Sequence, residues 1–347
     1  MSLSSPQADL PAEAVRVAAP ASAIGPIAAP TSSLTARRFL LALDLPMRHA
    51  GPRRVRVRGE WRGPADAPWV VVAGGISAGA RVASDARGEG WWPAQVGLGR
   101  AIDTDRRRVL AIDWLGADGD LDQPIDPADQ ADALAAVLDH LEVPRLSAFV
   151  GASYGAMVGL QFAARHGDRL DRLVAISGAH RPHPYASAWR ALQRQVVALG
   201  RGEGQVSRGL ALARQWAMLS YRTPEEFAER FDTPAVVDGE RARVAAEDYL
   251  AHCGQAYAAR WCSTAFLRLS ESIDLQQVDP SRITTPTTVV AIAEDRLVPL
   301  SDLQALVESL GGPARLRVLR SRYGHDAFLK EDSAITRVLR ESLEVVA

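Results

Sequence analysis

The sequence predicts an α/β fold, with a mostly parallel sheet and helices on both of its faces. Short apolar runs such as "WVVVAGG" from residue 69 recur along the chain. Gly-rich or Asp-rich residues follow each run, and helical patterns fall between the runs. Residues that are apolar at successive positions suit strands covered on both faces, as in a parallel sheet between helix layers.

The expected elements can be placed in chain order. The apolar runs predict strands that begin near residues 69, 108, 146, 172, 287 and 315. Helical periodicity predicts helices that begin at Pro127, Tyr154 and Leu300, and the last of these ends on two glycines, as a helix end should.

The order of these patterns divides the chain into segments. Strand signals stop between residues 185 and 275, where several helical segments follow one another. An all-helical insertion of this kind usually forms a cap over the strand ends, where α/β proteins keep their sites. We therefore expect a core over 36–184 and 276–347 and a helical cap over 185–275. The Ala- and Pro-rich residues 1–35 predict a disordered tail.

Composition narrows the class of protein. A net charge of -1 and a pI near 6.7 give no global basic field of the kind that nucleic acid or anionic membranes attract, so we expect small-molecule partners. The two cysteines, Cys253 and Cys262, cannot form a disulfide framework and lack zinc-site neighbours. No run approaches the roughly 20 apolar residues that span a bilayer. These features favour a soluble cytoplasmic protein without a metal.

The stretch "GASYG" at 151–155 contains the candidate nucleophile, Ser153. It fits the G-x-S-x-G elbow, in which small flanking residues allow a strained turn between a strand and a helix to expose the serine oxygen. An apolar run precedes it and a helical pattern follows, as the elbow requires. The alternative is a small residue in a tight turn.

A serine hydroxyl needs an imidazole to accept its proton. Of the seven histidines, His325 follows the last predicted strand, in the loop where α/β-hydrolases place their base. We predict His325 as the base, with His180 as the alternative.

The base in turn needs a carboxylate to fix its tautomer. Asp295 ends a predicted strand, and the order Ser153, Asp295, His325 is that of α/β-hydrolases. Glu294 is the fallback. Asp326 is disfavoured as this acid because a neighbour in sequence cannot easily hold the ring from behind.

An oxyanion hole should combine the N–H after the nucleophile with one from the loop after an early strand. Tyr154 supplies the first. The glycine-rich "VVVAGGISAGA" favours Ile76 as the second, with Gly75 or Ser77 next. This loop could also cradle a phosphate, but it lacks the Lys-Ser/Thr of a P-loop and the full dinucleotide-binding spacing.

Five motifs together resemble the homoserine O-acetyltransferase and O-succinyltransferase family of α/β-hydrolase-fold acyltransferases. They are "GWWPAQVGLGRAIDTDR" from 90, "GASYGAMVGLQFAARHGDRLDRLVAISGA" from 151, "LQRQ" from 192, "GLALARQWAMLSYR" from 209 and "GHDAFL" from 324. The resemblance runs over roughly residues 40 to 340, and five motifs in one order are far more specific than the elbow alone.

The resemblance implies a ping-pong reaction that feeds methionine synthesis. Ser153 would take an acyl group from acyl-CoA, the co-substrate, and pass it to the side-chain hydroxyl of L-homoserine. It also implies that Arg214 holds the substrate carboxylate, that Asp326 meets its ammonium group, and that the protein is a homodimer. No tightly bound cofactor is implied.

Two departures from the family bear on the substrates. Where most relatives carry His-Ala-Leu-Thr-Gly, this chain has Gly-Gly-Ile-Ser-Ala at 74–78, and Tyr154 stands where methionine is common. The divergent loop and an arginine-rich cap favour a succinyl over an acetyl donor. Acylation of serine by the same route, or ester hydrolysis by an α/β-hydrolase esterase, are the alternative functions.

Overall fold

The computed structural model describes residues 36–344, which form an eight-stranded sheet flanked by helices. The strand order is β1-β2-β6-β3-β7-β8-β11-β12. The bounds are Arg37–Met47 (β1), Gly51–Arg62 (β2), Trp69–Ala73 (β3), Arg108–Ile112 (β6), Ala148–Ala152 (β7), Leu173–Ile176 (β8), Thr287–Ile292 (β11) and Ala314–Leu319 (β12). The predicted tail over 1–35 lies outside the described residues, as do residues 345–347.

All six predicted strands are present, and they pair in parallel. The antiparallel pair β1 and β2 was not predicted, although its sequence carries the signal of a strand with one solvated face. Burial alternates along β2: Val55 and Val57 are buried, whereas Arg54 and Arg56 are exposed. Two further short parallel strands, β4 (Val96–Gly97) and β5 (Ile102–Asp103), pair with each other outside this sheet.

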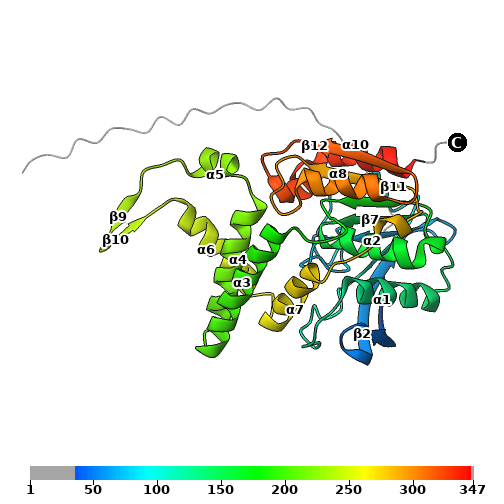
Figure 1. The fold of residues 1–347 in the computed structure, drawn as a ribbon, viewed down its shortest axis with the longest axis horizontal. Coiled ribbons are helices and arrows are strands. Elements are labelled where there is room, and N and C mark those ends of the chain that lie inside the picture. Colours follow the sequence, from blue (N-terminus) through cyan, green and yellow to red (C-terminus); the bar gives the residue numbers. More distant parts are fainter. Residues whose placement is uncertain (1–35, 345–347) are drawn as a thin grey trace, which may run out of the picture. The chain divides into compact units, whose positions relative to one another are not determined.

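Helices cover both faces of the sheet (Figure 1). Helices α1 (Pro127–His140), α2 (Tyr154–His166) and α8 (Leu300–Ser309) share one apolar cluster, and α10 (Asp332–Leu343) belongs to the cluster on the opposite face. The strands serve both clusters because successive side chains point to opposite faces. In β7, Phe149 packs in the first cluster and Val150 in the second, both fully buried. Each such burial stabilises the fold by about 1.5–3 kcal/mol.

Local sequence explains where these helices begin. Helix α1 starts at a capping box, because the Asp126 side chain accepts a hydrogen bond from the Ala128 N–H and the Asp129 side chain accepts one from the Asp126 N–H. Pro127 occupies its first position, where a missing N–H costs nothing.

The chain between β8 and β11 forms what we call the cap. Its helices are α3 (Pro184–Gly202), α4 (Val206–Tyr221), α5 (Pro224–Phe231), α6 (Ala246–Ala258) and α7 (Ser263–Asp274). Figure 1 shows α3, α4 and α6 packed side by side, with a hairpin of β9 (Val236–Asp238) and β10 (Arg241–Arg243) beyond them.

The hairpin corrects the expectation that the cap is all-helical. It turns through Gly239, whose φ of +61° suits a two-residue hairpin loop. Asp238-Gly239 after the valine pair at 236–237 is the local signal for such a turn. The signal is short, and helical periodicity on both sides of it favours helix. The cap has a small apolar core of its own, made by Val197, Leu210, Ala213, Tyr257 and Phe266.

Parallel pairing determines where a site can form. The carboxyl ends of β3, β7, β11 and β12 lie along one edge of the sheet because these strands run in the same direction. The loops that leave this edge carry Ile76, Ser153, Asp295 and His325. Among residues 36–344, no helix is both long and apolar enough to cross a membrane.

Candidate active site

Ser153 lies in a strained turn between β7 and α2. Its φ of +56° and ψ of -119° fall in a region that residues with a side chain rarely adopt. The neighbouring glycines make the turn possible, because a Cβ on Gly151 would lie 2.3 Å from the Gly155 carbonyl oxygen and one on Gly155 would lie 2.3 Å from the Ala73 oxygen. The turn directs the serine side chain out of the sheet edge, as the elbow pattern predicts.

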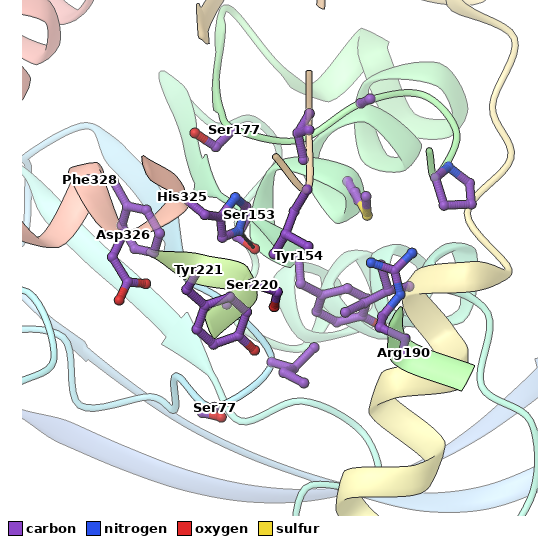
Figure 2. Close-up of a pocket in the computed structure, with 18 of the residues that line it drawn as sticks. Ser77, Ser153, Tyr154, Ser177, Arg190, Ser220, Tyr221, His325, Asp326 and Phe328 are labelled. Carbon is purple, nitrogen blue, oxygen red and sulfur yellow. Dashed lines mark hydrogen bonds between the residues drawn. The ribbon is translucent and has the colours of Figure 1, made fainter. Parts of the chain in front are cut away.

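His325 lies within hydrogen-bond distance of this serine. The loop after β12 forms a short 3-10 turn over Gly324–Asp326, and it brings His325 Nε2 to 2.8 Å from Ser153 Oγ. The imidazole is buried. Figure 2 shows the two side chains pointing toward one another across the floor of the pocket.

Asp295 holds the far side of the imidazole. Its Oδ2 lies 2.7 Å from His325 Nδ1, which places the proton on Nδ1 and leaves Nε2 free to accept the serine proton. Its Oδ1 accepts hydrogen bonds from the N–H groups of Leu297 and Val298, at 2.8 and 3.0 Å. Both carboxylate oxygens are therefore occupied, and the side chain is fully buried.

The alternative base and acid lie elsewhere. Glu294 accepts a hydrogen bond from the Ser321 N–H at 2.8 Å instead of contacting the imidazole. Nδ1 of His180 is buried with no hydrogen-bond partner among the described residues, and this histidine is absent from the cavity wall that Ser153 lines.

The negative charge of Asp295 changes the pKa of His325. Burial of the imidazole opposes protonation, but the adjacent Asp295 carboxylate outweighs burial and raises the pKa of His325 above its ordinary value. An imidazole with a raised pKa is a stronger base, and the carboxylate stabilises the imidazolium that forms when it accepts a proton.

No hydrogen bond among residues 36–344 uses the backbone N–H of Tyr154 or of Ile76, and the same holds for the alternatives Gly75 and Ser77. The loop that carries Ile76 lies against the nucleophile, since a Cβ on Gly75 would be 4.0 Å from Ser153 Oγ. Unpaired N–H groups at this place can stabilise a developing oxyanion.

Tyr154 and this loop pack as one unit through Trp114. The Trp114 indole donates a hydrogen bond to the Gly75 carbonyl oxygen at 3.0 Å and packs edge-on against the Tyr154 ring, with centroids 4.9 Å apart. The Tyr154 phenol is buried and shares a 2.6 Å hydrogen bond with Ser272 of the cap helix α7. Burial raises the pKa of Tyr154, so the phenol stays neutral. The loop 74–78 and Tyr154, which are the two departures from the family pattern, therefore lie next to each other.

A cavity of about 210 Å³ opens above Ser153, with walls from the core and the cap. Charged and polar residues from both parts line it: Arg181, Arg190, Arg214, Tyr221, Asp302 and Asp326. Among the described residues, no group of three or more His, Cys, Asp or Glu side chains is placed to hold a metal ion.

Comparison with known proteins defines the family. A family model for the α/β hydrolase fold matches residues 68–332. Homoserine O-succinyltransferase of Xanthomonas campestris pv. campestris is 59% identical over 318 residues, which cover 91% of this chain and 86% of that protein. Homoserine O-acetyltransferase of Thermus thermophilus is 32% identical over 282 residues, covering 72% of this chain and 71% of that protein.

The chain belongs to the homoserine O-acetyltransferase and O-succinyltransferase family. Its members are acyltransferases, and this chain is therefore an enzyme of that class. The fold agrees: the crystal structure of homoserine O-acetyltransferase from Bacillus anthracis superposes with a TM-score of 0.80, covering 89% of this chain and 97% of that one at 15% identity.

Arg214, the residue that the family resemblance assigns to a substrate carboxylate, lies in the cavity wall without an ion-pair partner among the described residues. Its guanidinium carbon lies 5.3 Å from the Tyr221 ring centre and 5.0 Å from that of Tyr257. Burial raises the pKa of Tyr257 to about 12, so this phenol stays neutral and leaves the positive charge of Arg214 uncompensated.

Asp326, which the resemblance assigns to an ammonium group, also lines the cavity, but it already has a cationic neighbour. Arg222 Nε lies 3.0 Å from Asp326 Oδ2, outside hydrogen-bond geometry. Arg222 also donates to Glu226 at 3.0 Å, so its charge is shared between two carboxylates. Glu226 also accepts a hydrogen bond from Arg230 at 3.1 Å, so two guanidinium groups face two carboxylates in this cluster.

Three residues of the site were missed by sequence reasoning. They are Trp114, Arg190 in the cavity wall, and Tyr221, whose ring centre lies 6.0 Å from that of His325. Trp114 follows a predicted strand in "IDWLG", and an aromatic residue at the active edge of the sheet was the available signal. Nothing in the helical periodicity of the cap distinguishes Arg190 from its other arginines.

Proposed function

We propose that this protein is a homoserine O-succinyltransferase that works through a succinyl ester on Ser153. The observation that carries the proposal is the chain of hydrogen bonds from Ser153 through His325 to Asp295, in a cavity that also presents the uncompensated cation of Arg214. The 59% identity to a protein named homoserine O-succinyltransferase favours this donor and acceptor over others.

In the first half-reaction, Ser153 Oγ attacks the thioester carbonyl of succinyl-CoA while His325 Nε2 accepts the hydroxyl proton. The negative charge that forms on the carbonyl oxygen is stabilised by the N–H groups of Tyr154 and Ile76. The C–S bond then breaks, and the imidazolium gives its proton to the departing CoA thiolate. Asp295 stabilises the imidazolium between these two transfers.

In the second half-reaction, the side-chain hydroxyl of homoserine attacks the acyl-serine carbonyl. His325 accepts the proton of this hydroxyl, the bond between the acyl carbon and Ser153 Oγ breaks, and the proton returns to the serine. Arg214 binds the α-carboxylate and Asp326 the ammonium group, which fixes the hydroxyl above the ester. O-succinylhomoserine leaves, an intermediate suited to methionine synthesis.

Transfer competes with hydrolysis, because water can attack the same ester. Helices of the cap form one wall of the cavity and narrow the access of solvent to Ser153. An amino acid that is bound at both of its charged groups has a high effective concentration at the ester, whereas water is held by nothing.

Isotope exchange tests the proposal. In the absence of any amino acid, labelled CoA should enter the succinyl-CoA pool, because the first half-reaction is complete and reversible. Exchange from acetyl-CoA should be slower. Ser153→Ala should abolish exchange, whereas Ser207→Ala, at an exposed serine of the cap, should retain it.

Other results would point elsewhere. Exchange that requires homoserine would contradict an acyl-enzyme intermediate. Rapid hydrolysis of simple esters with no acyl transfer to homoserine would indicate an esterase. Preferred transfer to serine would indicate a serine O-acyltransferase.

A further inference from the structure

Arg190 is a cavity residue that the proposed mechanism does not use. It lies in the first half of α3, and its side chain is only 11% exposed. Its Nε and Nη2 are bound by Asp274, at 2.8 and 2.6 Å, and Nη2 also lies 3.1 Å from Ser187 Oγ. Its Nη1 has no hydrogen-bond or ion-pair partner among residues 36–344, although the residue lines the cavity.

The charges around Arg190 do not balance. Asp274 is shared by two guanidinium groups, since its Oδ2 also accepts a hydrogen bond from Arg194 Nη1 at 2.7 Å. One carboxylate against two cations leaves a net positive charge in a mostly buried place. A buried charge is costly unless an opposite charge joins it, so the cluster is suited to an anionic ligand.

The cation lies on a different side of the nucleophile from the groups assigned to the amino acid. In Figure 2, Arg190 and Asp326 lie on opposite sides of Ser153, and Tyr221 lies below it. Arg214, the other residue assigned to the amino acid, packs against Tyr221. The charge of Arg190 is close enough to lower the pKa of His325, in opposition to Asp295.

Acyl transfer requires separate binding regions for the acyl chain and for the attacking amino acid. In the tetrahedral intermediate, the acyl chain and the attacking oxygen leave the reacting carbon in different directions. An amino acid bound at Arg214 and Asp326 therefore directs the acyl chain away from them, toward Arg190. A succinyl chain ends in a carboxylate, whereas an acetyl chain ends in a methyl group.

We infer that Arg190 Nη1 binds the terminal carboxylate of the succinyl group and so selects dicarboxylic acyl thioesters. Asp274 positions the guanidinium by holding its other two nitrogens, and Arg194 keeps the cluster positively charged. This inference rests on the proposed acyl transfer through Ser153 and adds the residue that determines the donor.

The test compares donors that differ only at the end of the chain. Succinyl-CoA and butyryl-CoA have the same number of acyl carbons, but only the first carries a charge. The measurement is the rate of acylation of Ser153, read as release of CoA thiol in a single turnover. Wild-type protein should prefer succinyl-CoA by about 10- to 100-fold, the range expected for hydrogen bonds to a charged group.

Arg190→Gln should bring the succinyl-to-butyryl ratio close to one. The matched control is Arg194→Gln, which removes a cation from the same Asp274 and the same helix but from a side chain outside the cavity wall. This control removes the excess positive charge but leaves Arg190 Nη1 free to contact the ligand, so it should lower the preference less than Arg190→Gln does. Arg214→Gln should keep the preference and should instead weaken use of homoserine.

A second variant covers the case in which Arg190→Gln does not fold. Arg190→Lys keeps the positive charge but places it closer to the backbone of α3. The donor preference of this variant should therefore shift from succinyl-CoA toward the longer glutaryl-CoA. An unchanged order of donors in this variant would overturn the inference.

The remaining outcomes separate the two proposals. If wild-type protein is succinylated but shows no preference over butyryl-CoA, or if R190Q keeps the wild-type ratio, only the inference about Arg190 fails. If R194Q loses the preference as fully as R190Q, the cluster acts through its overall charge and the contact is wrong. If no thioester acylates Ser153, both proposals fail.

Discussion

His325 shows how one neighbouring charge sets the working range of a site. The imidazole can accept the serine proton only while it is neutral. Because Asp295 raises its pKa above the ordinary value of about 6.5, the acid limb of the rate profile should lie above that pH.

Asp295→Asn should therefore move the acid limb of acylation to lower pH. It should also lower the rate by about 10⁴-fold, because an amide no longer fixes the tautomer of His325. The measurement is kcat/KM for succinyl-CoA against pH. Glu294→Gln, one residue away and bound to a loop N–H instead of the imidazole, should leave the limb in place. A limb that stays at the same pH in Asp295→Asn would contradict this role.

The Tyr154 side chain should matter for stability more than for chemistry. In Tyr154→Phe, the Ser272 hydroxyl loses its buried partner, and the free energy of unfolding should fall by about 1–2 kcal/mol. Activity should change by only a few-fold, because the oxyanion donor is a backbone N–H that the substitution keeps. Urea unfolding and kcat measure the two effects.

Adding Ser272→Ala removes the hydroxyl that Tyr154→Phe leaves without a partner, so the double variant should be less destabilised than the sum of the single ones. Loss of most activity with unchanged stability would instead mean that the phenol takes part in the reaction.

Residues that carry chemistry in a short pattern could be predicted individually from the sequence. The spacing around Ser153 predicts a strained turn, and Asp295 and His325 each follow a strand signal. The structure brings these three together, but their catalytic roles stay predictions. Trp114 and Arg190 could not be found in this way, because their positions depend on packing between segments far apart in the chain.

At the scale of elements, the elbow depends on close contact between α2 and the strands beneath it. A Cβ on Gly155 would lie 2.3 Å from the Ala73 carbonyl oxygen, a backbone atom that cannot rotate away. Gly155→Ala should therefore lower the free energy of unfolding by at least about 2 kcal/mol and displace Ser153. Thermal unfolding and the acylation rate would detect both effects.

Gly202→Ala is the matched control for that substitution. This glycine is also helical, at the end of α3, and a Cβ there would meet nothing within 4 Å. It should leave stability unchanged or slightly higher. Equal destabilisation by the two substitutions would show that the contact with Ala73 is not what makes Gly155→Ala costly, because alanine has the higher helix propensity at both positions.

Elements with a strong period were predicted well, and the others were not. Strands buried on both faces carry unbroken apolar runs, so β3, β6, β7, β8, β11 and β12 were all predicted. Strands β1 and β2 alternate apolar and charged residues because one of their faces is solvated, and this pattern is a weaker signal than an unbroken apolar run. The hairpin of the cap is too short for any period, and only its Asp-Gly turn marks it.

At the scale of the whole molecule, the family resemblance predicts a homodimer, and we propose that the cap carries the contact. On α3, Tyr185, Leu192 and Leu199 recur every seventh residue and are 55%, 43% and 70% exposed. Apolar residues at this spacing form one stripe along a helix and suit packing against another helix.

Leu192→Lys combined with Leu199→Lys should convert the dimer to a monomer, because each lysine would place a charge in the apolar contact. Light scattering measures the mass in solution. Leu40→Lys, at an exposed leucine of the edge strand β1, should leave the dimer intact. A monomeric wild-type protein, or a double variant that stays dimeric, would contradict this placement.

Everything proposed here about function requires a covalent acyl group on Ser153. Intact-protein mass spectrometry after mixing with succinyl-CoA alone measures it most directly. We predict that the protein gains the mass of one succinyl group, that Ser153→Ala gains none, and that homoserine removes the added mass faster than serine or water does. A wild-type protein that never gains mass while O-succinylhomoserine accumulates would contradict the acyl-enzyme account.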